Sequence, residues 1–468
     1  MVIPKEIKKI ISDLKKAGFE AYIVGGCVRD YLLSSEPKDW DVTTNAKPQE
    51  IQKVFPDSFY ENKFLTVTAR TGSKKESLKE VEITTYRLEA KYSDKRHPDE
   101  VRFAKTLEED LARRDFTVNA MALTEETRNK KQETRVVDLF DGQGDLKNKI
   151  IRTVGNPEER FSEDALRMLR AARLATTLGF NIEEKTAKAI KKNSIWLQAI
   201  SKERIRDEFL KIIMAGRAAD GVELLRELGL LKLIVPELEE NYGVGQNKHH
   251  IFDCYTHALK SLEYTAKKNF SMEVRLAALF HDIGKPRVKV GQGVDSTFYN
   301  HEVVGAKMVF QILDRLKLPK KDVEKIVTLV RYHLFYYNVG EVSESSVRRL
   351  VKNVGPENME ALLEVRQADR IGSGVPKAEP YKLRHLKYII EKVSKDPISA
   401  KMLKVNGNNV MNILDIKPGP KIGQILDILL GYVLQEPKKN NKEFLASEIK
   451  KLGKLDDKKL KSLSVKSR

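Results

Sequence analysis

The sequence has few cysteines and no long apolar run. Its two cysteines, Cys27 and Cys254, stand far apart and lack CxxC or any other metal-binding spacing, so no disulfide framework is predicted and a reducing cytoplasm fits. The longest apolar candidate, residues 425–434, falls short of the roughly 18 residues that span a bilayer and contains Asp427 and Gly431. The N-terminal residues mix lysines into a helical pattern, where a secretory signal needs an uninterrupted apolar stretch. We therefore expect a cytoplasmic protein that does not enter a membrane.

Negative charge is also in deficit. The 468 residues include 67 acidic and 85 basic side chains, a formal net charge of +18. This balance attracts polyanions through long-range steering and counterion release, so nucleic acid is the expected partner class, with a merely well-solvated surface as the alternative. Hydrophobic residues make up 41% and charged residues 32%, which excludes wholesale disorder. At about 150 residues per domain, the length predicts roughly three folding units.

The secondary-structure pattern changes along the chain. Residues 19–151 alternate short β-rich runs with turns and predict an α/β unit with a small mixed sheet. From Pro157 onward, helical periodicities follow almost without strands, so the second two-thirds is predicted to be all-α. Residues 437–468 hold 11 Lys and Arg against 4 Asp and Glu, and the order of these last turns stays open.

The run AYIVGGCVRDYLL predicts a strand at residues 21–24, a Gly25-Gly26 turn and a helix that begins near Cys27. Glycines let the backbone approach a ligand closely, and a helix N-terminus presents free N–H groups to an anion. Arg29, in the first turn of this helix, adds a bidentate donor suited to phosphate oxygens. The run predicts a phosphate cradle, with a simple tight turn as the alternative.

Two aspartates follow in the run KDWDVTT. In an extended strand, Asp39 and Asp41 point to the same face about 7 Å apart, so both can hold a pair of divalent ions about 4 Å apart. In VEITTYR, alternation places Glu82 on the face opposite Val81 and Ile83, as a third acidic ligand or an ordinary exposed glutamate. The spacing predicts a catalytic acidic cluster, with a surface strand as the alternative.

At these residues the chain resembles a known family. GGCVRD followed by DWD resembles the nucleotidyltransferases of the polymerase-beta superfamily. Four further motifs resemble, in order, those of the class II tRNA nucleotidyltransferases: ARRDFTVNAMA, DLFDGQGDL, EDALRMLRAARLA and ERIRDE. The resemblance implies template-independent addition of CCA to the 3′ end of tRNA from CTP and ATP, with two Mg²⁺ ions in the head.

The implied reaction is in-line attack by the tRNA 3′-hydroxyl on the α-phosphate, with release of pyrophosphate. Residues 91–117 resemble the flexible loop of the CCA-adding and A-adding members and differ from the poly(A) polymerases. An A-adding specialist and a poly(A) polymerase are the alternatives within this class. We expect residues 87–103 to move when the pocket switches from CTP to ATP.

Glu163, Asp164 and Arg167 are predicted on one helix, where Asp164 and Arg167, three residues apart, share a face. The Asp164 carboxylate would accept from the exocyclic amine of cytosine or adenine, and the Arg167 guanidinium would donate to the ring nitrogen. UTP and GTP would meet acceptor against acceptor and donor against donor. The resemblance assigns these two positions to base recognition, and a helix-surface salt bridge is the alternative.

The other motifs of the head and neck predict contacts to the nucleotide and support for its pocket. We expect Arg113, Arg114 and Asp115 to contact the phosphates and ribose, since a triphosphate needs cations and a ribose hydroxyl needs an acceptor. Structural support beside the pocket is expected from Glu163, Arg204 and Glu208. The last two lie at i and i+4 on a predicted helix.

Six of the eight histidines lie between residues 249 and 333. Imidazole and carboxylate ligands from different helices are a usual way to hold a catalytic metal with an open position. FHDIGK and its surroundings resemble an HD-domain phosphohydrolase, which implies a divalent metal of undetermined identity on His257, His281, Asp282 and Asp369. The remaining two members, His301 and His333, are expected to orient a phosphate or hold a second ion. A set of core histidines is the alternative.

The HD resemblance implies hydrolysis of phosphate esters, including 2′,3′-cyclic ends of damaged tRNA. Two interpretations of another class are an HD phosphohydrolase with an RNA-binding front domain and a passive RNA-binding protein. The expected partners are tRNA, CTP and ATP, with no membrane, and the choice between monomer and homodimer stays open. The predicted domains are an α/β head (1–152), an all-α neck (153–215), an all-α body (216–375) with the HD domain at about 245–372, and a helical basic tail (376–468).

Overall fold

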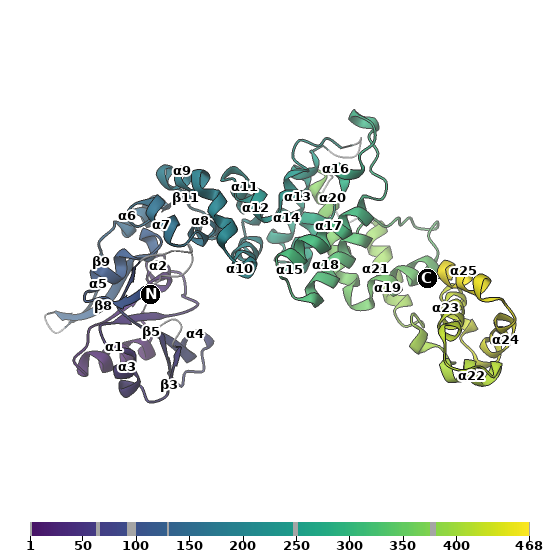
Figure 1. Ribbon diagram of the computed structural model, residues 1–468, viewed down its shortest axis with the longest axis horizontal. Coiled ribbons are helices and arrows are strands. Elements are labelled where there is room, and N and C mark those ends of the chain that lie inside the picture. Colours follow the sequence, from purple (N-terminus) through teal and green to yellow (C-terminus); the bar gives the residue numbers. More distant parts are fainter. Residues whose placement is uncertain are drawn as a thin grey trace. The chain divides into compact units, whose positions relative to one another are not determined.

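The computed structural model describes residues 2–61, 66–90, 100–128, 131–246, 251–374 and 381–467 in two compact units (Figure 1). The first unit comprises Met1–Glu240 with Asp314–Leu318, and the second comprises Asn241–Leu313 with Pro319–Arg468. The chain begins as an α/β structure and continues as a mostly helical one. This confirms the predicted fold class. Within the described ranges, no helix is long and apolar enough to cross a membrane.

A mixed sheet forms the head, and its described part has seven strands in the order β3-β4-β5-β2-β1-β8-β9. The strands are β1 (Ala21–Val24), β2 (Asp41–Thr44), β3 (Ser58–Glu61), β4 (Thr66–Arg70), β5 (Glu80–Thr85), β8 (Met121–Arg128) and β9 (Lys131–Asp138). β2 runs parallel to β5, and the other neighbouring pairs are antiparallel. The parallel register places Asp41, the first residue of β2, opposite Glu82 of β5.

The N-terminal helix packs through one apolar face. α1 (Lys5–Lys16) buries Ile7, Ile10, Ile11 and Leu14, whose spacing follows the helical period, and it contacts β1 and α3. The other helices of the head are α2 (Gly26–Leu32), α3 (Pro48–Val54), α4 (Glu76–Lys79), α5 (Leu107–Ala112), the short 3₁₀ helix η1 (Thr117–Asn119) and α6 (Gly142–Asn148).

A hairpin occupies the segment that the sequence predicts to move. β6 (Arg87–Ala90) pairs antiparallel with β7 (Glu100–Phe103), with Arg87 opposite Phe103. Residues 91–99, between these strands, lie outside the described residues. The movement of this segment stays a prediction.

Helices follow the sheet after the short strand β10 (Ile150–Ile151): α7 (Pro157–Glu163), α8 (Leu166–Leu178), α9 (Glu184–Asn193), α10 (Lys202–Ile213), α11 (Ala218–Glu227), α12 (Leu231–Ile234) and α13 (Pro236–Glu239). The prediction of one helix carrying Glu163, Asp164 and Arg167 is wrong. α7 ends at Glu163, Asp164 has extended backbone, and Arg167 lies in the first turn of α8. The Asp164 carboxylate accepts from the Leu166 N–H at 3.0 Å, and such local bonds compete with a continuous helix.

The second unit is a helical assembly with its core around α14, α15 and α20. Its longer helices are α14 (Cys254–Lys267), α15 (Met272–Phe280), α17 (His301–Arg315), α18 (Lys320–Tyr332), α19 (Glu344–Val354), α20 (Met359–Gly372), α21 (Tyr381–Val393), α22 (Gly407–Leu414), α23 (Pro420–Gln435), α24 (Lys442–Gly453) and α25 (Asp457–Ser467), and the short α16 spans Lys285–Val288. The basic end of the chain is therefore helical through Ser467, with Leu460 fully buried.

Candidate functional site

Three carboxylates meet at one end of β2 in the head. Asp41 pairs with Val24 of β1 on one side and with Glu82 of β5 on the other. The prediction that Asp39 lies in the same strand is wrong, because β2 begins at Asp41 and Asp39 lies in the preceding bend. The reason is that β1 ends at Val24, opposite Asp41, so Asp39 has no partner residue in that ladder.

The three carboxylates still interact electrostatically. Burial, Glu82 and Asp39 raise the pKa of Asp41 to about 6, against the opposing charge of Arg114. Burial, Glu61 and Asp39 likewise raise the pKa of Glu82. The cluster therefore carries more negative charge than the protein neutralises. Carboxylate oxygens are the ligands that Mg²⁺ prefers, so the donor set fits a divalent cation at this place.

Gly25, which follows β1, leaves space for the Arg114 guanidinium and the Asp41 carboxylate to lie close to the backbone. Its φ is +86°, and a Cβ there would lie 3.1 Å from Arg114 Nη1 and 3.3 Å from Asp41 Oδ2. A side chain would therefore crowd both groups in a backbone conformation that suits glycine. Next to it, Gly26 begins α2, and Arg29 in that helix donates to Asn119 Oδ1 at 2.7 Å. Of the predicted Gly-Gly turn, Gly25 lies beside the acidic cluster, whereas Arg29 bonds to Asn119 and Asp30.

The ARRD motif begins at the last residue of α5, and its charged side chains form ion pairs with Asp110 and Arg170. Arg113 pairs with the fully buried Asp110 at 2.7 Å, and Arg114 reaches the same carboxylate at 3.4 Å. Asp115 pairs with Arg170 of α8 at 2.6 Å. Burial raises the pKa of Asp115, but the charges of Arg170 and Arg167 outweigh it and lower this pKa to about 2. Asp115, predicted to accept from a ribose, is thus held ionised by α8.

Asp164 and Arg167 bond to different partners around the junction of α7 and α8. Asp164 Oδ2 accepts from Arg204 Nη2 of α10 at 2.7 Å. Arg167 pairs with Glu163 and donates to the carbonyl oxygen of Arg113 at 3.2 Å. The junction thus joins the end of α5, the two helices α7 and α8, and α10. Asp164 and Arg167, the two residues predicted to recognise the base, both lie at the junction of α7 and α8. Arg204 bonds to Asp164, and Glu163 pairs with Arg167.

Arg204 and Glu208 both lie on α10 but reach different neighbours. Arg204 holds Asp164, as described above, whereas Glu208 accepts from Arg173 of α8 at 2.5 Å and from Lys211 at 2.9 Å. Burial raises the pKa of Glu208, and Arg173 with Arg170 more than offsets this and lowers it. The Glu208–Arg173 pair connects α10 with α8, and the Arg204–Asp164 pair connects α10 with the junction of α7 and α8; support of a nucleotide pocket by these residues stays a prediction.

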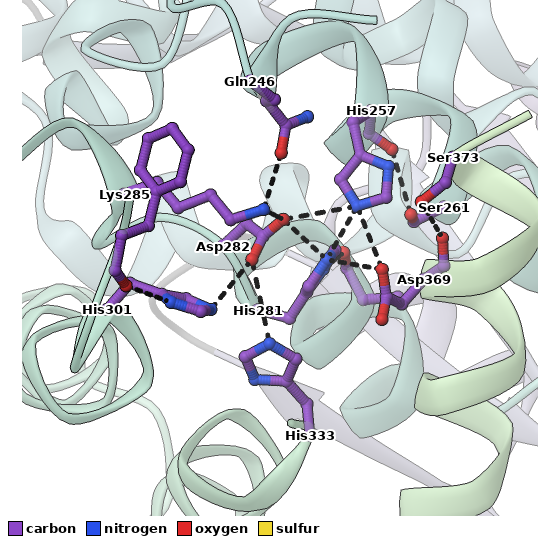
Figure 2. A network of polar contacts seen from close by, with 12 residues as sticks. Gln246, His257, Ser261, His281, Asp282, Lys285, His301, His333, Asp369 and Ser373 are labelled. Atoms are coloured by element: carbon purple, nitrogen blue, oxygen red, sulfur yellow. Dashed lines mark hydrogen bonds and ion pairs between the residues drawn. The ribbon is translucent and has the colours of Figure 1, made fainter. Parts of the chain in front are cut away.

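The second candidate site is built around Asp282 (Figure 2). Asp282 Oδ2 lies 3.3 Å from His257 Nε2 and 3.2 Å from His281 Nε2. The other oxygen, Oδ1, lies 3.3 Å from His301 Nε2 and 3.7 Å from His333 Nε2. The five residues form two groups that share Asp282, each with ligand atoms close enough to hold one metal ion.

Asp369 of α20 adds a second carboxylate to the first of these groups. Its Oδ1 lies 3.3 Å from His257 Nε2, and its Oδ2 accepts from Arg366 at 2.8 Å. This geometry needs a close approach of α20 to α14. Gly372 permits it, because a Cβ at that position would overlap the hydroxyl of Ser261.

Local bonds orient the imidazoles. In His281, His301 and His333, Nδ1 lies 2.7 to 2.8 Å from the carbonyl oxygen three residues earlier. A carbonyl only accepts, so Nδ1 carries a proton, and Nε2 is the ring atom left to bind a metal once its own proton is absent. Gly284 lets the segment after Asp282 pack against the start of α17, since a Cβ there would overlap the His301 carbonyl oxygen.

We call the six residues described above the HD centre: His257, His281, Asp282, His301, His333 and Asp369. Charges within this centre shift one another's pKa values. Burial lowers the pKa of His281, but Asp282 and Asp369 outweigh it and raise this pKa to about 10. Burial and the charge of His281 lower the pKa of His333 to about 3. The imidazoles hold the pKa of both carboxylates well below the usual range despite burial. Imidazole nitrogens with carboxylate oxygens are a donor set that fits a divalent transition-metal ion.

Some residues of these sites were missed in the sequence. Lys285 donates to Asp282 Oδ2 and to Gln246 Oε1, each at 2.6 Å, and its position three residues after Asp282 in FHDIGK was an available signal. Asp110 stands three and four residues before the arginines of ARRD, which is also a helical pairing distance. Arg170 gave no such local signal. Two histidines of the cluster, His249 and His250, lie outside the described residues.

The sequence matches three known domain families. Residues 21–152 match the poly A polymerase head domain, residues 179–242 the probable RNA and SrmB-binding site of polymerase A, and residues 254–371 the HD domain. A head of this type, followed by a helical region that matches a probable RNA-binding model, defines a nucleotidyltransferase that also carries an HD domain.

Full-length relatives narrow this class. The CCA-adding enzyme of Ligilactobacillus salivarius is 33% identical over 466 residues, which is 96% of this chain and 98% of the relative. The A-adding tRNA nucleotidyltransferase of Deinococcus radiodurans is 33% identical over 422 residues, 87% of this chain and 90% of the relative. The crystal structure of the Bacillus stearothermophilus CCA-adding enzyme in complex with CTP superposes with a TM-score of 0.67 at 26% identity, covering 96% and 98% of the chains. The chain belongs to the CCA-adding enzyme family of nucleotidyltransferases.

Proposed function

We propose that this chain adds the CCA sequence to the 3′ end of tRNA, using CTP and ATP. The observation that carries the proposal is the pairing of Asp41 with Glu82 beside Gly25 and Arg114, an acidic cluster with a cation and a glycine turn at its edge. The family supplies the substrates, since its relatives are named for CCA addition and one of them binds CTP. The net charge of +18 favours a polyanionic partner such as tRNA.

The residues of the head divide the work of nucleotidyl transfer. Asp39, Asp41 and Glu82 would hold two Mg²⁺ ions. Such ions would lower the pKa of the attacking hydroxyl and neutralise the negative charge of the triphosphate. Arg114, beside Asp41, would bind the phosphates, and Gly25 leaves room for them. The 3′-oxygen of the tRNA bonds to the α-phosphorus as the bond to the β-phosphate breaks, so pyrophosphate leaves and the hydroxyl proton passes to solvent.

The junction of α7 and α8 would select the base. Asp164 has two carboxylate oxygens with about four acceptor sites, so it can accept from an exocyclic amine while it holds Arg204. Arg167 would donate to the ring nitrogen from a guanidinium that Glu163 keeps in place. CTP and ATP share this donor and acceptor pattern, and UTP and GTP reverse it.

One experiment tests this proposal and its alternatives. The purified protein is incubated with each labelled nucleotide and with tRNAs that lack CCA, end in C, or end in CC. An enzyme that adds CCA should incorporate C into tRNA that lacks CCA and into tRNA that ends in C. It should incorporate A into tRNA that ends in CC and into neither of the other two. Incorporation of A alone, and only into tRNA ending in CC, would show an A-adding enzyme, and long A tracts would show a poly(A) polymerase. No incorporation would contradict nucleotidyl transfer and leave an HD phosphohydrolase with an RNA-binding front domain.

The HD centre supports a second function, hydrolysis of phosphate esters. The supporting observation is the convergence of four Nε2 atoms on the two oxygens of Asp282, with Asp369 beside them. A divalent ion held there would supply a water ionised near neutral pH. With a 2′,3′-cyclic phosphate, the water oxygen bonds to phosphorus as one ring P–O bond breaks, which leaves a monoester and a free hydroxyl.

The test of this second function uses the wild-type protein alone. We expect hydrolysis of a 2′,3′-cyclic phosphate in the presence of at least one of Mg²⁺, Mn²⁺, Ni²⁺ or Co²⁺, and loss of that activity on chelation. Absence of hydrolysis with all four ions would contradict the proposal and leave a structural centre.

A further inference from the structure

An exposed aromatic side chain lies in line with the acidic cluster of the head. In the register of the sheet, Glu82 of β5 is opposite Thr68 of β4, and Thr68 is opposite Phe59 of β3. Because Glu82 is also opposite Asp41, these four residues form a row across β2, β5, β4 and β3. Directly paired residues point to the same face of a sheet, so Phe59 shares the face of the two carboxylates. The Cα atoms of Phe59 and Glu82 lie about 10 Å apart, which is two strand spacings.

The face of β3 that carries Phe59 is exposed. The Phe59 side chain is 38% exposed, and exposure alternates along the strand, so that Phe59 and Glu61 are the more exposed residues. Strand alternation puts Glu61 on the face of Phe59. Burial and the charge of Glu61 raise the pKa of Glu82, so this face of β3 is close enough to the acidic cluster to act on it.

Arg70, near the end of β4, gives this aromatic surface a positive charge. Its guanidinium carbon lies 5.6 Å from the centre of the Phe59 ring, within the range of a cation–π contact. Its ion pairs with Asp57 at 3.8 Å and with Glu80 at 3.6 Å are long and solvent-exposed, and such pairs contribute little. The guanidinium can therefore donate to a phosphate oxygen while it stays beside the ring. An aromatic face next to a cation is the combination that binds single-stranded nucleic acid.

The acidic cluster determines which strand can reach this surface. In the proposed reaction the 3′-hydroxyl of the tRNA lies at the acidic cluster, so the nucleotides that precede it lie nearby. Successive bases of a strand are about 3.4 Å apart, so the distance of about 10 Å corresponds to about three nucleotides. We propose that one of the last unpaired bases of the tRNA 3′ end stacks on Phe59, a positioning residue, with Arg70 at its phosphate. The inference rests on the nucleotidyl transfer proposed above and names a site for the acceptor strand.

Binding of two RNAs tests the proposal. One is a tRNA that ends in CC, and the other is the same tRNA cut back to the blunt end of its acceptor stem. Phe59→Ala should weaken binding of the first about tenfold, as loss of one stacked base does, and leave binding of the second unchanged. Phe59→Trp should bind both as wild type does, because an indole keeps a flat face, whereas Phe59→Leu should behave as Phe59→Ala. Phe310→Ala is the matched control and should change neither, since Phe310 is 53% exposed and lies on α17 in the second unit.

Kinetics and salt dependence separate the two side chains. With tRNA that ends in CC, Phe59→Ala should raise KM for the tRNA about tenfold and leave KM for ATP unchanged, because other residues are assigned to the incoming nucleotide. Loss of a purely structural contact would not divide the two KM values in this way. Arg70→Gln should weaken binding of the same tRNA and lower the slope of log K against log salt by about 0.7, which is one phosphate contact on a single strand.

The outcomes distinguish this inference from the proposed function. If Phe59→Ala binds the tRNA that ends in CC as wild type does, or loses affinity equally for both RNAs, the inference is overturned while nucleotidyl transfer stands. If binding depends on Phe59 only for the tRNA that ends in CC, but wild-type protein incorporates no nucleotide, the stacking site is supported and only the proposed function fails. Wild-type protein that binds neither RNA would overturn both.

Discussion

Asp41 lies directly opposite Glu82 in the parallel ladder between β2 and β5, and Glu82 raises the pKa of Asp41. The two residues stand 41 positions apart in the sequence, and only the crossover from β2 to the parallel strand β5 brings them together. A carboxylate held at a pKa of about 6 by burial and by other carboxylates is poised for a cation. The head therefore carries an acidic cluster whose negative charge a bound cation would neutralise.

We expect Gly25 to be essential for nucleotide incorporation. The main reason is the lack of space for a side chain at this position, in addition to the positive φ of its backbone. Gly25→Ala forces a methyl group toward Arg114 and Asp41, so we expect loss of most nucleotide incorporation. Gly18→Ala is a matched control, since Gly18 also has positive φ, at +88°, and has nothing within 4 Å of its Cβ position. Both variants should lose about 1–3 kcal/mol of stability, because positive φ strains an alanine. Equal activity of the two variants would contradict the crowding argument.

Asp164 and Arg167 should set the choice of nucleotide. Asp164→Ala or Arg167→Ala leaves one edge group of the base unpaired, at about 1–3 kcal/mol, so selectivity for CTP and ATP over UTP and GTP should fall about tenfold to a hundredfold. Incorporation of all four nucleotides by each variant measures this. If the two residues serve only in salt bridges, unfolding will occur at lower denaturant while selectivity stays unchanged.

The ion pair between Asp115 and Arg170 should make stability depend on pH. The pKa of Asp115 is about 2 in the folded protein, against 3.8 ordinarily, so the pair stabilises the fold above about pH 4 and loses this contribution as the pH falls toward 2. We expect the stability difference between wild type and Asp115→Asn to shrink by about 2 kcal/mol over this interval. Denaturant unfolding at several pH values measures it, and a constant difference would refute the assignment.

The HD centre should act independently of the head, because its ligands lie in the second unit and the acidic cluster lies in the first. His281→Ala combined with Asp282→Ala should remove hydrolysis of phosphate esters and leave CCA addition nearly intact. His385→Ala, a change of a histidine on α21 that is not among these ligands, should leave both activities intact. Loss of both activities in a double variant that remains folded would show that the two sites depend on each other.

Local patterns predicted the parts of these sites that depend on spacing alone. The end of β1 before Gly25 and the outward face of Glu82 follow from glycine conformation and strand alternation. The break at Asp164 did not follow, because the apolar periodicity continues through residues 157–178. Bonds of Asp164 to Leu166 and to Arg204, 40 residues away, accompany that break. Tertiary partners of this kind leave no periodic signal.

The histidine cluster shows the same limit. The residue types in FHDIGK and the later helices were enough to name the ligands as a set, and the structure brings them together. The sharing of Asp282 between two groups depends on how α17 and α18 approach α15, which Gly284 and other close contacts decide. Such packing between helices is set by the whole assembly of side chains.

The central claim is that the acidic cluster of the head performs nucleotidyl transfer. Its most direct test is incorporation of labelled CMP and AMP into tRNA lacking CCA, at saturating Mg²⁺, by Asp41→Ala and Asp39→Ala. We expect both variants to lose incorporation and to bind tRNA as wild type does, whereas Asp57→Ala, a change of an exposed aspartate of the head, keeps both. Incorporation near the wild-type rate by either Asp39→Ala or Asp41→Ala would contradict the account.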